Sequence, residues 1–112
     1  AISNAKVFAD YYAITTVPSN ATGNIPVIGA KVANSLLEMK NIKASFVLSE
    51  YKSRIQISAR SIDDANVQLI MEKLGGGGHS TVAAAQLDMS LSEAVAALKE
   101  VITNMIKEGD LK

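Results

Sequence analysis

The sequence predicts a single domain of the α/β class, an α+β sandwich in which helices cover a mixed β-sheet. Three observations support this fold. The chain has 112 residues, enough for one hydrophobic core and hardly enough for two. Apolar residues alternate with polar ones in some segments and recur at helical spacing in others. These segments follow one another as strand, helix, strand, strand, helix, strand and helix, an order that indicates a sheet packed against helices.

The first strand and the first helix are separated by a loop. Tyr11 to Val17 is rich in aromatic and β-branched residues, which favour a strand. Residues 18–26 contain two prolines and several turn formers, so they predict a connection inside the domain. A helix that begins at Pro26 or Val27 is indicated by apolar residues at helical spacing, namely Ile28, Val32, Leu36 and Met39.

Two further strands form a predicted hairpin across the polar link of residues 50–53. Apolar and small polar residues alternate over residues 44–49, and a second alternation covers residues 54–60. This second strand buries Ile55, Ile57 and Ala59. It places Ser58 and both arginines of the chain, Arg54 and Arg60, on the opposite face.

A second helix and another strand follow the hairpin. The apolar residues of this helix are Val67, Ile70, Met71 and Leu74. Asp63 or Asp64 is the expected N-cap, and Gly75 stands where a C-terminal glycine is expected. The small apolar residues from Val82 to Asp88 then predict a strand.

The last helix has the clearest boundaries. Ser90 and Glu93 have the spacing of a capping box, and Gly109 is expected to end the helix. Its predicted buried stripe consists of Leu91, Val95, Leu98, Ile102 and Met105.

Composition excludes several classes of function. Eleven basic and 11 acidic residues give a formal net charge of zero, which argues against binding nucleic acid by bulk positive charge. The chain has no cysteine and one histidine, so thiolate catalysis and multi-histidine metal centres are excluded. The acidic residues are scattered, and no nucleophile–base pair is visible. We therefore expect a domain that binds but does not catalyse, and, because residue 1 is Ala, a piece of a longer protein.

Four consecutive glycines, Gly75 to Gly78, followed by His79, form the most informative segment. Each ordered glycine costs roughly 0.5–1 kcal/mol relative to alanine, and a helix cap explains only Gly75. Glycine lets a backbone approach a ligand closely, and successive N–H groups can bind an anion. The run is neither a P-loop nor a dinucleotide fingerprint, because it closes a helix and lacks spaced glycines. A ligand-contacting loop is favoured, while a flexible linker and a structural turn stay open.

Three side chains near this run are candidates for ligand contacts. His79 is better suited to hydrogen bonding or stacking than to metal ligation, since no second histidine or neighbouring carboxylate accompanies it. Arg60 ends its strand toward the edge that holds the glycines, where a guanidinium can meet a phosphate. Asn66 could read the edge of a base. Each has an equally ordinary alternative as a surface or capping residue, and Arg54 is expected to be solvated at the hairpin end.

The segment from Leu74 to His79, followed by Ala83 to Ala85, resembles the Gly-Gly-Gly-His…Ala-Ala signature of the DHH-associated domain. That domain is the C-terminal half of the DHH-superfamily phosphoesterases. The chain also resembles the membrane-bound cyclic di-AMP phosphodiesterases of the GdpP type. This closer resemblance rests on less specific residues than the glycine–histidine motif: Met39 to Leu48, Ile57 to Ser61, Asn66–Val67 and Ile70–Met71. Gln86 stands where other branches have glycine, which fits the GdpP-like subset.

The resemblance implies that residues 1–112 are a DHH-associated substrate-binding domain, with no cofactor of its own. The glycine run and His79 would contact the nucleotide, with Arg60, Ser58 and Asn66 as supporting contacts. Two manganese ions would be held by an upstream DHH domain, so the fragment alone should be inactive. The whole protein would hydrolyse cyclic di-AMP to pApA, and this domain would lie on the cytoplasmic side of a bacterial membrane to which the protein is anchored.

Other functions stay open at this stage. The same domain occurs in oligoribonucleases and single-strand exonucleases of the superfamily, for which a short oligonucleotide would be the partner. A related domain of alanyl-tRNA synthetases suggests a non-catalytic RNA-binding module, which the neutral charge disfavours. A structural or homodimerisation module, in which the glycines only form a turn, is the third alternative.

Overall fold

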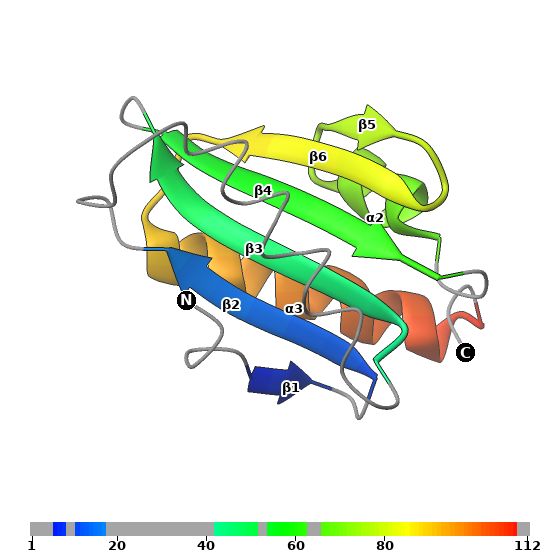
Figure 1. The fold of residues 1–112 in the computed structure, drawn as a ribbon. Coiled ribbons are helices and arrows are strands. Elements are labelled where there is room, and N and C mark those ends of the chain that lie inside the picture. The colour runs from blue at the N-terminus through cyan, green and yellow to red at the C-terminus, as the bar shows by residue number, and fades with distance from the viewer. Residues whose placement is uncertain (1–5, 9–10, 18–41, 52–53, 63–65, 110–112) are drawn as a thin grey trace.

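A computed structural model describes residues 6–8, 11–17, 42–51, 54–62 and 66–109. These residues form one mixed sheet with helices packed against it (Figure 1). The elements are β1 (Lys6–Phe8), β2 (Tyr12–Val17), β3 (Ala44–Tyr51), β4 (Arg54–Ser61), α2 (Val67–Lys73), β5 (Gly77–Gly78), β6 (Val82–Leu87) and α3 (Leu91–Lys107). The predicted fold class is confirmed. The helix expected from Ile28 to Met39 and its loop lie outside the described residues.

The sheet has the strand order β1-β2-β3-β4-β6-β5. Strands β2 and β3 are parallel, and the other neighbours are antiparallel. The predicted hairpin is confirmed as β3 and β4, which pair from Ala44 opposite Ser61 to Tyr51 opposite Arg54. Two short strands, β1 and β5, were not expected from the sequence. Strand β5 consists of two glycines, which have low intrinsic strand propensity.

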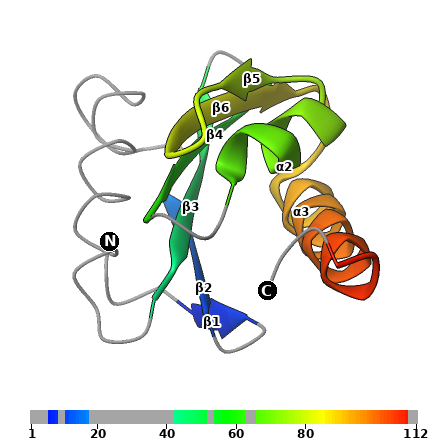
Figure 2. The same ribbon diagram turned by 90° about the vertical axis from the view of Figure 1, so that its right-hand side faces the viewer.

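Helices α2 and α3 cover the same face of the sheet (Figure 2). Helix α3 begins at the predicted capping box: the Glu93 N–H donates to Ser90 Oγ at 3.2 Å, and the Ser90 N–H donates to Glu93 Oε1 at 3.1 Å. Its fully buried residues are Ala94, Leu98, Ile102 and Met105. The predicted Leu91 and Val95 are only partly buried, because they lie at the edge of that stripe. None of the described helices has the length and apolar character of a membrane-spanning segment.

One predicted cap is wrong. Asn66, rather than Asp63 or Asp64, is the N-cap of α2, and its Oδ1 accepts a hydrogen bond from the Leu69 N–H at 3.2 Å. Residues 63–65 lie outside the described part of the chain. All three residue types can cap a helix, so the sequence could not choose among neighbouring candidates.

The centre of the sheet is buried on both faces. Phe46 and Leu48 of β3 join the apolar core beneath the helices, and Val47 on the other face is also fully buried. The alternation of β4 is as predicted, since Ile55, Ile57 and Ala59 all belong to the core. Ser58 lies on the opposite face but is only 5% exposed, so this face is not a uniformly solvated surface.

Candidate functional site

The glycine run begins by ending α2. Gly75 has φ +88°, and its N–H donates to the Glu72 carbonyl at 3.1 Å. The Gly76 N–H donates to the Met71 carbonyl at 2.8 Å. Together these bonds form a Schellman motif, which satisfies the last carbonyls of the helix. The predicted role of Gly75 as the C-terminal glycine is confirmed.

The next three glycines are not equivalent. A methyl group on Gly76 would lie 2.1 Å from the Ala84 carbonyl oxygen, and one on Gly78 would lie 2.5 Å from the Val82 oxygen. Both positions therefore need glycine because their backbone packs directly on β6. Gly77 pairs with Ala84, and a methyl group there would meet no atom within 4 Å. A structural turn thus accounts for Gly75, Gly76 and Gly78 but leaves Gly77 unexplained.

The end of the run is tied to two other elements. The His79 N–H donates to the Val82 carbonyl at 2.6 Å. The Ser80 carbonyl accepts from the Val67 N–H at the start of α2 and from Ser61 Oγ at the end of β4, both at 3.0 Å. These bonds argue against a flexible linker. They hold the exposed side chain of His79 at a defined edge of the sheet.

The strand register brings Arg60 to this edge. Arg60 of β4 lies opposite Val82 of β6, and His79 is bonded to the other side of Val82. The half-buried guanidinium donates through Nη1 to the Ala59 carbonyl at 2.8 Å, and no carboxylate pairs with it among the described residues. Burial lowers the pKa of Arg60, although an arginine stays protonated at neutral pH. The edge therefore holds a partly desolvated positive charge.

The two remaining predicted residues have structural surroundings. Ser58 is buried between Val47 and Ala84, in the same row across the sheet as Gly77. Asn66 uses its side-chain oxygen to cap α2, so that atom is engaged within the fold. Ser58 and Asn66 thus lie close to the glycine run in the topology. Ser58 is buried, whereas Asn66 is half-buried like Arg60 but has its side-chain oxygen engaged in the cap.

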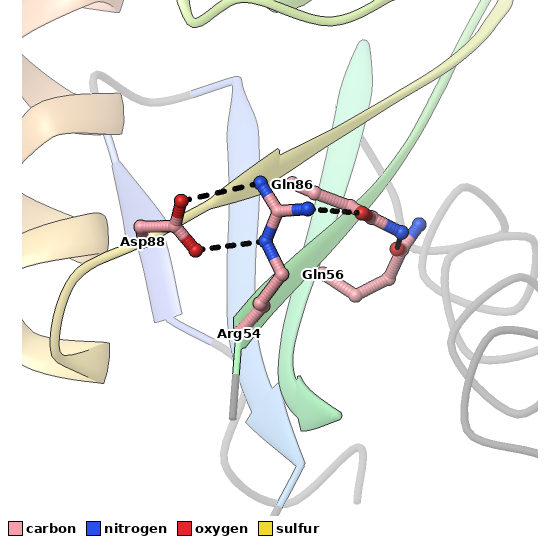
Figure 3. A network of polar contacts seen from close by, with 4 residues as sticks. All are labelled: Arg54, Gln56, Gln86 and Asp88. Atoms are coloured by element: carbon pink, nitrogen blue, oxygen red, sulfur yellow. Dashed lines mark hydrogen bonds and ion pairs between the residues drawn. The ribbon is translucent and has the colours of Figure 1, made fainter. Parts of the chain in front are cut away.

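A polar cluster that lies at the Arg54 end of β4 was not predicted from the sequence. We call the side of β4 and β6 that faces away from α2 and α3 the outer face. On it the Arg54 Nε lies 2.8 Å from Asp88 Oδ1, and Arg54 Nη1 donates to Gln86 Oε1 at 3.2 Å (Figure 3). Gln86 Nε2 in turn donates to Gln56 Oε1 at 3.0 Å. Arg54 is exposed as expected, but it is ion-paired rather than only solvated. Gln56, Gln86 and Asp88 share the period-two spacing of their strands, a signal that needs the β4–β6 register to be recognised.

The groups around the glycine run are of types that can contact an anionic ligand. Within the described ranges, no group of three His, Cys, Asp or Glu side chains could hold a metal ion. The outer face instead offers a guanidinium, an exposed imidazole and a backbone edge without side chains. Strand β5 is the last strand of the sheet that the structure describes, so its outward N–H and C=O groups pair with no other described strand. Such a surface suits an anionic ligand that lies against the backbone.

Comparison with known proteins identifies the family of the chain. Residues 10–108 match the DHHA1 domain. The chain is 48% identical over 85 residues to the cyclic-di-AMP phosphodiesterase GdpP of Geobacillus thermodenitrificans, covering 74% of the chain and 13% of the relative. It is 40% identical over 111 residues to GdpP of Bacillus subtilis, covering 96% of the chain and 17% of the relative.

A solved structure shares the fold closely. An exopolyphosphatase-related protein from Bacteroides fragilis superposes with a TM-score of 0.83 at 26% identity, over 93% of this chain and 32% of that one. The chain thus spans less than a fifth of the two curated relatives and about a third of this structure. Because the family match covers nearly its whole length, the chain belongs to the DHHA1 domain family.

Proposed function

We propose that this domain supplies the nucleotide-binding surface of a phosphodiesterase that hydrolyses cyclic di-AMP to pApA. Relatives at 40–48% identity are named as cyclic-di-AMP phosphodiesterases, which supports the substrate class. The metal ions for hydrolysis would belong to an upstream DHH domain of the same, membrane-anchored protein. The described residues of this chain offer no ligand set for them.

The observation that carries the proposal is the position of Arg60 beside the end of the glycine run. Arg60 and His79 flank Val82, and Gly77 leaves the neighbouring backbone bare where the fold does not require glycine. The guanidinium would pair with a phosphate, and outward amide groups of β5 would approach the sugar–phosphate backbone. The exposed His79 ring would lie beside the nucleotide, where it can stack or donate a hydrogen bond.

The separate roles proposed for this domain and for the metal-bearing domain are consistent with the net charge of this chain. A domain with no net charge, whose described residues offer no group of metal ligands, should bind a dinucleotide weakly on its own. The metal-bearing domain would supply most of the electrostatic attraction. Closure of the two domains would bring Arg60 to the opposite side of the phosphate from the metals. We expect the 112-residue chain by itself not to hydrolyse cyclic di-AMP.

The test removes the Arg60 charge. In Arg60→Ala, the affinity of the intact protein for cyclic di-AMP should fall about 10- to 100-fold, the equivalent of a charge-assisted hydrogen bond worth about 1.5–3 kcal/mol. Lys107→Ala is the control, because this exposed cation lies in the last turn of α3, away from the outer face. Calorimetric titration measures both. Equal affinities for Arg60→Ala and the wild type would refute a phosphate role for Arg60.

The rates at which the intact protein hydrolyses cyclic di-AMP and short RNA distinguish the candidate substrate classes. Cyclic di-AMP should be hydrolysed in preference to short linear RNA if the proposal is right. Preference for short RNA would instead assign the domain to an oligoribonuclease. Binding of RNA with a steep salt dependence and no hydrolysis would favour the RNA-binding module.

A further inference from the structure

The polar cluster around Arg54 borders an open hollow on the outer face. Its volume is about 380 Å³. Its lining includes the small residues Gly75, Gly76 and Ala84 and the polar side chains of Arg54, Gln56 and Gln86. The hollow therefore joins the start of the glycine run to side chains that the proposed phosphate contact does not use.

The hydrogen bonds of the cluster fix the orientation of both amides. A guanidinium can only donate, so the Gln86 oxygen must face Arg54 and its nitrogen must face Gln56 (Figure 3). Gln56 then has to accept that bond through Oε1. Its own Nε2 consequently points away from Gln86, and it makes no hydrogen bond to any part of the chain that the structure describes.

This arrangement suits a base better than a phosphate. The carboxylate of Asp88 lies against the Arg54 guanidinium, so the positive charge there is already offset. Gln56 presents two N–H donors and, on Oε1, a second lone pair. A donor beside an acceptor in one plane matches the edge of adenine, which offers an acceptor ring nitrogen next to its amino group. Because neighbouring bonds already hold the amide, little side-chain entropy is lost when a base binds.

The spacing on the strands fits a ligand with more than one part. Gln56 lies opposite Gln86, and Arg60 lies opposite Val82. These two cross-strand pairs are separated by four residues along β4 and β6. At about 3.3 Å per residue, the two pairs are roughly 13 Å apart. A ligand with a phosphate at Arg60 and a base in the hollow must extend across Ala84 and Gly77, where side chains are small or absent.

We propose that this hollow is a nucleobase subsite, in which the Gln56 carboxamide, oriented by Gln86 and Arg54, hydrogen-bonds the edge of an adenine base. The inference rests on the proposed function, because it assigns a second part of the same ligand. In it Gln56 touches the ligand, and Gln86 and Arg54 act as positioning residues.

The test follows side-chain amide signals by NMR in the isotopically labelled chain. Titration with cyclic di-AMP should shift the signals of the Gln56 side chain and of the Gly77 backbone. Ribose 5-phosphate, which lacks a base, should shift Gly77 and leave Gln56 unchanged. Shifts at Gly77 without any at Gln56 in the presence of cyclic di-AMP would overturn the subsite and leave the proposed function standing. Because the domain alone is expected to bind weakly, the titration extends to millimolar ligand. No shift at either residue at that concentration would overturn both.

A substitution provides an independent measurement. Gln56→Glu keeps the shape of the side chain but replaces the donor by a charged oxygen, so the affinity for cyclic di-AMP should fall about tenfold. The affinity for ribose 5-phosphate should stay within about twofold. Gln68→Glu on α2 is the matched control, because it adds the same charge to a side chain whose amide, among the described residues, bonds only Glu72. An equal loss of affinity in both variants would show a general charge effect and overturn the subsite.

Discussion

Each end of the outer face holds an arginine, but in the part of the chain that the structure describes only one of the two guanidinium groups is paired with a carboxylate. Arg54 and Arg60 lie on the same face of β4. Arg54 has a carboxylate at 2.8 Å, whereas Arg60 is half-buried and bonded only to a main-chain carbonyl among the described residues. A guanidinium that is already ion-paired organises its neighbours, and one that is desolvated without a carboxylate is suited to an incoming anion. For these two arginines, the presence or absence of a carboxylate partner therefore decides between positioning neighbouring side chains and binding a ligand.

The largest effect is expected where the backbone of the glycine run meets β6. Gly76→Ala places a methyl group 2.1 Å from the Ala84 oxygen, beside the hollow at the Arg54 end. We expect the free energy of unfolding to fall by about 3 kcal/mol, as in an overpacked core. Gly77→Ala, one residue nearer the Arg60 end, should change it by less than about 0.5 kcal/mol. Urea unfolding followed by circular dichroism measures both.

Gly76→Ala and Gly77→Ala together test whether these two positions of the glycine run have different roles. If Gly77→Ala is as destabilising as Gly76→Ala, the glycine run is structural throughout. The bare backbone near Arg60 would then need no ligand to explain it. If Gly77→Ala folds normally yet binds cyclic di-AMP more weakly, the run has a structural part and a binding part.

A smaller effect is expected when the ion pair of the Arg54 end is removed. Asp88→Asn should lower the free energy of unfolding by less than about 1 kcal/mol, because both side chains are largely exposed, at 47% and 77%. It should also make Arg54 resemble Arg60: cyclic di-AMP should bind slightly more tightly at low ionic strength, and this gain should disappear at high salt. Calorimetry at two salt concentrations measures the change. A loss of several kcal/mol of stability would instead show that the pair holds the sheet together.

What the sequence could predict here is what depends on near neighbours. The Ser90–Glu93 capping box and the Gly75 helix end each lie within one turn of chain, and both are confirmed. The cluster of Arg54 with Gln86 and Asp88 spans 32 and 34 residues, so it depends on how β4 pairs with β6. Nothing local distinguishes an arginine that will find a carboxylate from one that will not.

Glycine and cap positions show the same limit. Four adjacent glycines indicate an unusual backbone, but only the packing against β6 separates Gly76 and Gly78 from Gly77. Likewise, Asn66 rather than an aspartate caps α2 because β4 and the loop at Ser80 fix where the helix begins. The family resemblance pointed to the region of the candidate site, and the tertiary contacts distinguish the surroundings of its individual residues.

The smallest expected effect uses acid to weaken the capping box of α3, which follows the Arg54 end in the chain. Ser90, two residues after Asp88, caps α3, and hydrogen bonds from its backbone N–H and from its side chain lower the pKa of Glu93. A carboxylate whose pKa is depressed in the folded state stabilises the fold above its unfolded pKa of about 4.3. That contribution is lost as the pH falls through the lower pKa of the folded protein. In Glu93→Gln the side chain can keep the capping bond but does not titrate.

The melting temperature should therefore fall more steeply between pH 6 and pH 3 in the wild type than in Glu93→Gln. All other carboxylates titrate in both proteins, so the difference between the two curves isolates the capping box. The Arg60 end contains no such carboxylate on its side of β4 among the described residues. Parallel melting curves would mean that the capping box contributes through its geometry and not through the charge of Glu93.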